Sequence, residues 1–277
     1  MAVSLSKVEQ SAPALVSLYK TAGASVERRG LSGQSLAVYL VIDYSGSMRP
    51  YYKDGSVQAL ADRVLGLSAH LDDDGTVPVV FFSTEVDAQA EIALADHEGW
   101  IDRIVASLGH MGKTSYHLAM EAVVRHYRAS GSTAPALVLF QTDGGPINKR
   151  AAEVGLCEAA KLPIFWQFVG FGDPGSRQFD FLRKLTGLAV PEMRPIDNAG
   201  FVHLGRDPRK VSDRDLYDLL LAEVPVWLAA ARAQGIAPQG AALRPPAEPA
   251  AEAAPEPPQR RGLWAALTAW LGRRRGV

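Results

Sequence analysis

Two apolar runs in this chain each lead into a short cluster of polar residues. Residues 36–42 are nearly all apolar and are followed by Asp-Tyr-Ser-Gly-Ser at 43–47. Residues 136–140 are also apolar, and Thr-Asp-Gly-Gly follows at 142–145. Such runs are typical of strands buried on both faces of a parallel sheet. Because binding sites of open α/β sheets form at the carboxyl ends of the strands, we expect the two polar clusters to meet there.

These clusters, together with one distant threonine, form a candidate metal site. Its residues are Asp43, Ser45, Ser47, Thr114 and Asp143. Alternate residues that leave a strand can point the same way and converge on one ion, and we expect Gly46 to let the backbone turn between the two serines. Oxygen ligands suit hard cations rather than zinc. We therefore expect Mg²⁺, with Mn²⁺ or Ca²⁺ as alternatives.

The order of these residues resembles a known family. Asp-x-Ser-x-Ser, a distant Thr and Thr-Asp-Gly are similar to the metal-ion-dependent adhesion site (MIDAS) of von Willebrand factor A (vWA) domains. The stretches 15–22, 47–58, 71–79 and 112–116 further resemble the vWA domain of TerF-type tellurium-resistance proteins. The resemblance covers about residues 5 to 235. It implies a Rossmann-like α/β fold, with a central, mostly parallel sheet flanked by helices.

The resemblance also implies roles for the candidate ligands. Ser45 and Ser47 would bind the ion directly, and Thr114 would do so in one state. Asp43 and Asp143 would act largely through water or as hydrogen-bond acceptors. An Asp or Glu of a protein partner would complete the coordination of the ion. The function implied is metal-dependent protein binding in a bacterial tellurite or stress response, by a protein that is not an enzyme.

Two other functions stay open at this point. The same ion could serve a Mg²⁺-dependent phosphoester hydrolase, although the sequence identifies no general base or nucleophile for it. The chain could also be a membrane-tethered scaffold that acts through its basic C-terminal segment.

The rest of the chain alternates between helical and strand patterns, which favours a mostly parallel sheet covered by helices. We expect Ser212 to cap the last helix and Pro225 to kink or split it. The expected helices cover residues 13–29, 55–71, 100–108, 115–128, 149–161, 178–185 and 212–232, and the expected strands 36–42, 77–82, 136–140, 164–169 and 201–204.

Composition divides the chain into four parts. Residues 1–34 form an N-terminal helical segment and residues 35–235 the vWA domain. Residues 236–258 are rich in Pro and Ala, which indicates a flexible linker because such a segment cannot bury a core. Residues 259–277 hold five arginines and no acid, and they show the apolar spacing of a basic amphipathic helix.

This last segment can lie on an anionic membrane or fit the groove of a protein partner. The residues expected to make that contact are Trp264, Leu267, Trp270, Arg273 and Arg274.

Charge and targeting signals limit where the protein is located and what it binds. A net charge of -1 gives no field that would favour nucleic acid, so we expect no nucleic-acid partner. The N-terminus has no basic stretch followed by an apolar core, and no run of about 18 apolar residues occurs. We therefore expect a cytoplasmic protein, able to lie peripherally at a membrane through its C-terminal helix.

Overall fold

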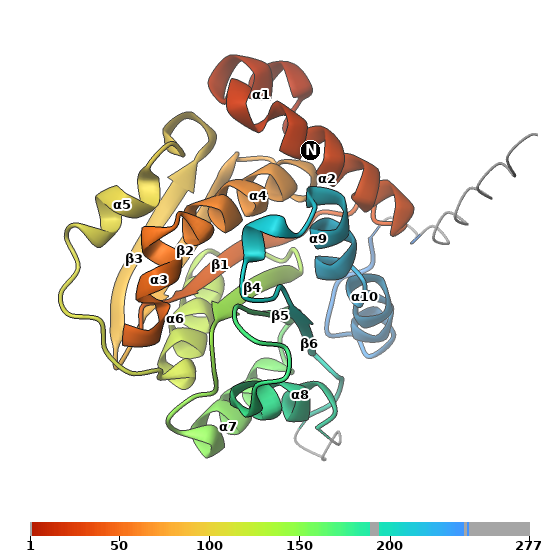
Figure 1. Ribbon diagram of the computed structural model, residues 1–277. Coiled ribbons are helices and arrows are strands. Elements are labelled where there is room, and N and C mark those ends of the chain that lie inside the picture. Colours follow the sequence, from red (N-terminus) through yellow and green to blue (C-terminus); the bar gives the residue numbers. More distant parts are fainter. Residues whose placement is uncertain (1, 189–193, 241–242, 244–277) are drawn as a thin grey trace, which may run out of the picture. The chain divides into compact units, whose positions relative to one another are not determined.

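A six-stranded sheet organises the part of the chain that this computed structural model describes, residues 2–188, 194–240 and 243 (Figure 1). The strands are β1 Ala37–Asp43, β2 Thr76–Phe82, β3 Val86–Ala93, β4 Ala136–Thr142, β5 Ile164–Gly170 and β6 Ala199–His203. Their order across the sheet is β3-β2-β1-β4-β5-β6. Only the β2–β3 pair is antiparallel. The expected mostly parallel sheet is therefore confirmed.

The edge strand β3 was not predicted from the sequence. Its residues alternate between small apolar and polar types, and only Ile92 among them is buried. An antiparallel edge strand can expose one face to water, so it needs no continuous apolar run. The other five strands appear within one or two residues of their predicted starts, and all five are largely buried.

Helices lie on both faces of the sheet (Figure 1). They are α1 Leu5–Ser11, α2 Val16–Arg28, α3 Arg49–Lys53, α4 Ser56–Leu71, α5 Trp100–Val105, α6 Tyr116–Ala129, α7 Lys149–Ala159, α8 Asp180–Thr186, α9 Asp213–Leu220 and α10 Val224–Ala233. Short 3₁₀ turns are η1 Pro13–Leu15, η2 Gly46–Met48, η3 Leu94–Asp96, η4 Arg177–Phe179 and η5 Pro208–Lys210. The sequence had not predicted α3, and it had placed α1 in the N-terminal helical segment 1–34 without distinguishing it as a separate helix.

The predicted helix over 212–232 is two helices, as its proline suggested. Ser212 caps α9, since its Oγ accepts a hydrogen bond from the backbone N–H of Asp215 at 3.1 Å. Pro225 lies in the first turn of α10, where its missing N–H would have no intrahelical partner. Both expectations are confirmed.

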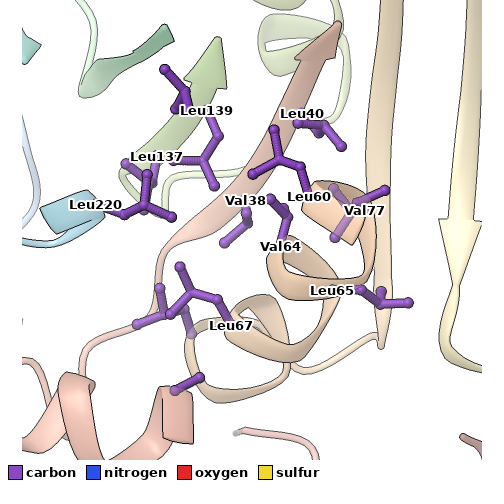
Figure 2. Packing of buried hydrophobic residues seen from close by; sticks show 14 of the residues in the cluster. Val38, Leu40, Leu60, Val64, Leu65, Leu67, Val77, Leu137, Leu139 and Leu220 are labelled. Atoms are coloured by element: carbon purple, nitrogen blue, oxygen red, sulfur yellow. The ribbon is translucent and has the colours of Figure 1, made fainter. Parts of the chain in front are cut away.

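Alternate residues of β1 point to opposite faces and build two apolar layers. Val38 and Leu40 face α4, where they pack with Leu60 and Val64, and Leu220 of α9 joins the same cluster (Figure 2). Helices α1 and α2 also bury side chains in this layer. The N-terminal segment thus shares a core with the sheet.

The second layer lies on the opposite face of the sheet. Tyr39 and Val41 of β1 pack there in one cluster with apolar side chains of α6, α7 and α8. Together the two layers bury β1 and β4 completely apart from the half-buried Ala37, so their carboxyl ends are held rigidly.

The C-terminal expectations fall mostly outside the described residues. The expected helix over 259–277, including Trp264, Leu267, Trp270, Arg273 and Arg274, lies wholly outside them, as does most of the linker over 236–258. At the start of that linker, Ala237 is buried and Leu243 packs against the core. Within the described ranges, no helix has the length and apolar character needed to cross a membrane.

Candidate metal centre

The carboxyl ends of β1 and β4 lie side by side in the middle of the sheet. The chain continues from β1 to β2 on one side, whereas β4 leads to β5 and β6 on the other. This reversal is the position at which open α/β sheets bind ligands. The register pairs Ile42 with Gln141, so the next residues, Asp43 and Thr142, end their strands together. The Thr142 hydroxyl donates a hydrogen bond to Asp43 Oδ2 at 2.7 Å, and both residues are fully buried.

The loop after β1 extends this pair toward the surface. The Ser45 backbone N–H donates to Asp43 Oδ1 at 2.7 Å. Ser47 Oγ donates to Asp143 Oδ1 at 2.9 Å and lies 3.2 Å from Ser45 Oγ. Because the single hydroxyl proton of Ser47 is directed to Asp143, Ser45 is the donor between the two serines. Four of the five predicted ligands therefore form one connected cluster.

Thr114, the fifth candidate, lies in a segment that runs beside the same loop. Ser45 and Gly112 form a parallel β-bridge, in which Gly46 N–H donates to the Gly112 carbonyl at 3.1 Å. The Thr114 carbonyl accepts a hydrogen bond from Ile147 N–H at 2.9 Å, which ties the segment to the loop after β4. The Thr114 hydroxyl makes no hydrogen bond to any residue that the structure describes. Its backbone is placed between the two loops, and its hydroxyl is available to a ligand.

The expected role of Gly46 was wrong. Its φ is not positive, and a Cβ built on it would meet nothing within 4 Å, so the turn between the serines does not require glycine. The glycine that the packing requires is Gly112. A Cβ there would lie 2.5 Å from Thr84 Oγ1 and 2.8 Å from Ser83 Oγ, closer than real Cβ atoms approach.

Three buried or half-buried residues that support the cluster were not among the predicted ligands. Tyr52 Oη donates to the Asp43 carbonyl at 3.0 Å. Tyr116 Oη donates to Thr142 Oγ1 at 3.2 Å and also contacts the Gly144 carbonyl. Thr142 belongs to the Thr-Asp-Gly cluster that the sequence marked, whereas no pattern marked the two tyrosines.

The two carboxylates of the cluster are held in an environment that disfavours their charge. Burial raises the pKa of Asp43 from 3.8 to about 7, against the hydrogen bonds from Thr142 and Ser45 and with the added repulsion of Asp143. Burial also raises the pKa of Asp143, against the hydrogen bond from Ser47. Among the described residues, no basic side chain lowers the pKa of either carboxylate. The cluster thus lacks a positive charge of its own.

The donor set fits a hard cation. Two carboxylates and three hydroxyls offer only oxygen, which suits Mg²⁺, Mn²⁺ and Ca²⁺. In the described ranges, no group of three or more His, Cys, Asp and Glu side chains could hold a metal. An ion at this place would depend on the hydroxyls of Ser45, Ser47 and Thr114 as well as on the two aspartates.

Comparison with known sequences agrees with this architecture. Residues 35–237 match the vWA-TerF-like family, described as the vWA domain found in the TerF C terminus. The uncharacterized protein YcbR of Bacillus subtilis (strain 168) is 37% identical over 227 residues, which cover 80% of this chain and 88% of that protein.

Two solved structures are similar to this chain over about two thirds of its length. The von Willebrand factor type A protein from Catenulispora acidiphila has a TM-score of 0.49 and 15% identity, over 69% of this chain and 42% of that chain. The manganese-loaded TRAP protein of Plasmodium vivax has a TM-score of 0.46 and 18% identity, over 68% of this chain and 75% of that chain. The match thus spans less than half of the first structure. Because both TM-scores lie below 0.5, the family assignment rests on the sequence matches.

Proposed function

The chain belongs to the family of vWA domains found in the TerF C terminus, and from this premise we propose that it is a metal-dependent protein-binding module of a bacterial tellurite or general stress response. vWA domains typically serve as protein-interaction modules. We place the interaction at the carboxyl ends of β1 and β4 and locate the protein in the cytoplasm.

The observation that carries this proposal is the unbalanced negative charge of the cluster. Asp43 is fully buried and Asp143 is half-buried, and among the residues that the structure describes neither has a basic neighbour that stabilises its charged form. A divalent cation would supply the missing positive charge. Asp43, Ser45, Ser47, Thr114 and Asp143 would hold it, with Mg²⁺ preferred and Mn²⁺ or Ca²⁺ also compatible. Once bound, the ion would offer a positively charged position to a carboxylate of a protein partner.

The protein residues set the geometry of this position. Both Asp43 oxygens already accept hydrogen bonds, from Ser45 N–H and Thr142 Oγ1, which supports a role through water rather than direct ligation. Ser47 is exposed, whereas Ser45 is buried behind it. The open side of the cluster therefore faces solvent at Ser47, where a partner can approach.

The surroundings of the hydroxyls support binding rather than a serine-dependent reaction. In the described part of the chain, no histidine is hydrogen-bonded to Ser45 or Ser47, and their hydroxyls contact each other and the aspartates of the cluster. A serine nucleophile needs an adjacent general base.

A peptide array tests this function. Each peptide carries a single Asp, Glu, Asn or Gln in a neutral sequence, and binding is measured with Mg²⁺ and with EDTA. The proposal predicts that only the acidic peptides bind, only with Mg²⁺, and not to the Asp43→Asn variant. Equal binding in EDTA, or equal binding by the variant, would refute it. Mg²⁺-dependent phosphoester turnover that is lost in Asp143→Ala would instead support the hydrolase.

A further inference from the structure

A hollow of about 240 Å³ adjoins the loop that carries the serines of the metal centre. Its lining includes Tyr44, Arg49, Tyr52, Lys53, His110 and Met111. One wall therefore comes from α3 and the other from the segment that precedes Gly112. The two walls are held together at the metal centre itself, because Gly46 N–H donates to the Gly112 carbonyl at 3.1 Å.

The lining places this hollow directly beside the candidate ligands along the chain. Tyr44 stands between Asp43 and Ser45, and Arg49 follows Ser47 by two residues. Tyr44 Oη donates to the Gly109 carbonyl at 3.2 Å, so its ring spans from one wall to the other. The hollow is therefore built on the same loop as the candidate ligands Ser45 and Ser47.

The charged residues of the lining are all basic. They are Arg49 and Lys53, which are exposed, and neither forms an ion pair with a described residue. Unpaired cations gathered around one hollow create a positive potential that attracts an anionic group.

Acids near this hollow accept hydrogen bonds from other residues, as Asp43 does from Thr142 Oγ1 at 2.7 Å. Burial is the main cause that raises the pKa of Tyr44 and Tyr52, and the charge of Asp87 adds to it, but Asp87 is half-buried and accepts a hydrogen bond from Ser83 Oγ at 2.9 Å. Asp54, next to Lys53, accepts from the Ser56 backbone N–H at 2.8 Å. None of these carboxylates lines the hollow.

We propose that this hollow is a second anion subsite, which takes a glutamate side chain from the same acidic protein segment whose other carboxylate completes the metal centre. The inference rests on the proposed function of that centre. It assigns the partner to a class, namely an acidic segment with two carboxylates close together in sequence.

The shape and chemistry of the hollow favour glutamate. Its volume is below the roughly 300–1,000 Å³ of ordinary small-molecule sites, which suits one side chain rather than a whole ligand. The rings of Tyr44 and Tyr52 and the side chain of Met111 offer apolar contact to the methylene groups of glutamate. Arg49 and Lys53, which also line the hollow, offer positive charge to its carboxylate.

The proposal is tested by measuring how tightly capped, otherwise neutral peptides bind to the full chain in the presence of Mg²⁺. One set of peptides carries a single Glu, and the other carries two Glu separated by one to four residues. We expect the best two-Glu peptide to bind more tightly than the one-Glu peptide, by up to about fivefold for each charge contact that its second Glu adds. The double variant Arg49→Gln, Lys53→Gln should lose this gain and keep its affinity for the one-Glu peptide. Lys20→Gln, an exposed lysine of α2, is the matched control and should keep the gain. High salt should reduce the gain in the wild type.

The outcomes separate this inference from the function on which it rests. If one-Glu peptides bind in a Mg²⁺-dependent manner but the second Glu adds nothing, the subsite is refuted and the metal-dependent function stands. The same conclusion follows if the gain survives in the double variant. If no acidic peptide shows Mg²⁺-dependent binding, the proposed function fails, and the subsite with it.

Discussion

Replacing Asp43 by Asn should make the metal-free protein more stable, although the same change should abolish metal binding. The carboxylate is fully buried and has no basic neighbour in the described part of the chain, whereas an amide carries no charge. The amide can keep both contacts. Its oxygen can accept from Ser45 N–H, and its NH₂ can donate to Thr142 Oγ1. The Thr142 hydroxyl can then turn to the Gly144 carbonyl, which lies 3.1 Å away.

The pKa of Asp43 sets the size of this effect. A rise from 3.8 to about 7 is about three pKa units, and each unit corresponds to about 1.4 kcal/mol. The ionised carboxylate therefore costs at most ~4 kcal/mol of stability at high pH. Burying an amide also has a cost, so we expect a net gain of about 2 kcal/mol. For a domain of this size, such a gain corresponds to a rise in Tm of roughly 4–8 °C.

The sign of the pH dependence follows from the raised pKa. Between about pH 4 and pH 7, the folded wild type binds more protons at Asp43 than the unfolded chain does. The contribution of Asp43 to the stability of the wild type is therefore lost as the pH rises through that window. The gain in stability of Asp43→Asn over the wild type should be largest at about pH 8 and small near pH 4.

Urea unfolding in EDTA at both pH values measures this difference, with Asp102→Asn, an exposed acid of α5, as the control. Added Mg²⁺ should then stabilise the wild type and leave Asp43→Asn unchanged. The reasoning would be refuted if Asp43→Asn were less stable than the wild type at about pH 8 in EDTA. A stability difference that did not shrink toward pH 4 would refute it equally.

Three further predictions concern the supports of the metal centre and the tail. Thr142→Val removes a donor to Asp43, so it should cost about 1–3 kcal/mol in urea unfolding in EDTA, and an unchanged midpoint would contradict the account. Gly112→Ala should cost about 1–3 kcal/mol through overpacking and weaken Mg²⁺ binding, whereas Gly109→Ala, where a Cβ meets nothing within 4 Å, should do neither. From its sequence, we expect residues 259–277 to be required for co-sedimentation with anionic vesicles, and full retention after their deletion would exclude that contact.

The sequence revealed the elements that are buried on all sides. The apolar run 36–42 predicted β1, and the run 136–140 predicted β4, because a strand covered by helices on both faces must be apolar throughout. Elements with little buried surface left no such signal. In β3 only Ile92 is buried, and in α1 only Val8 is buried.

The candidate site likewise has a part that could be predicted from the sequence and a part that could not. Asp43, Ser45, Ser47 and Asp143 could be predicted to meet because they follow strands whose parallel ends share one edge of the sheet. The contact from Tyr116 to Thr142 could not be predicted, because it depends on how α6 packs against β4. The basic hollow could not be predicted either, since residues more than fifty positions apart in sequence form its two walls.

Calorimetric titration of Mg²⁺ into metal-stripped protein tests the central claim most directly. The wild type and Asp43→Asn are compared, and both are first shown to be folded in EDTA. The account predicts saturable one-site binding by the wild type and none by the variant. Equal binding by both proteins, or no binding by the wild type with Mg²⁺, Mn²⁺ or Ca²⁺, would contradict it.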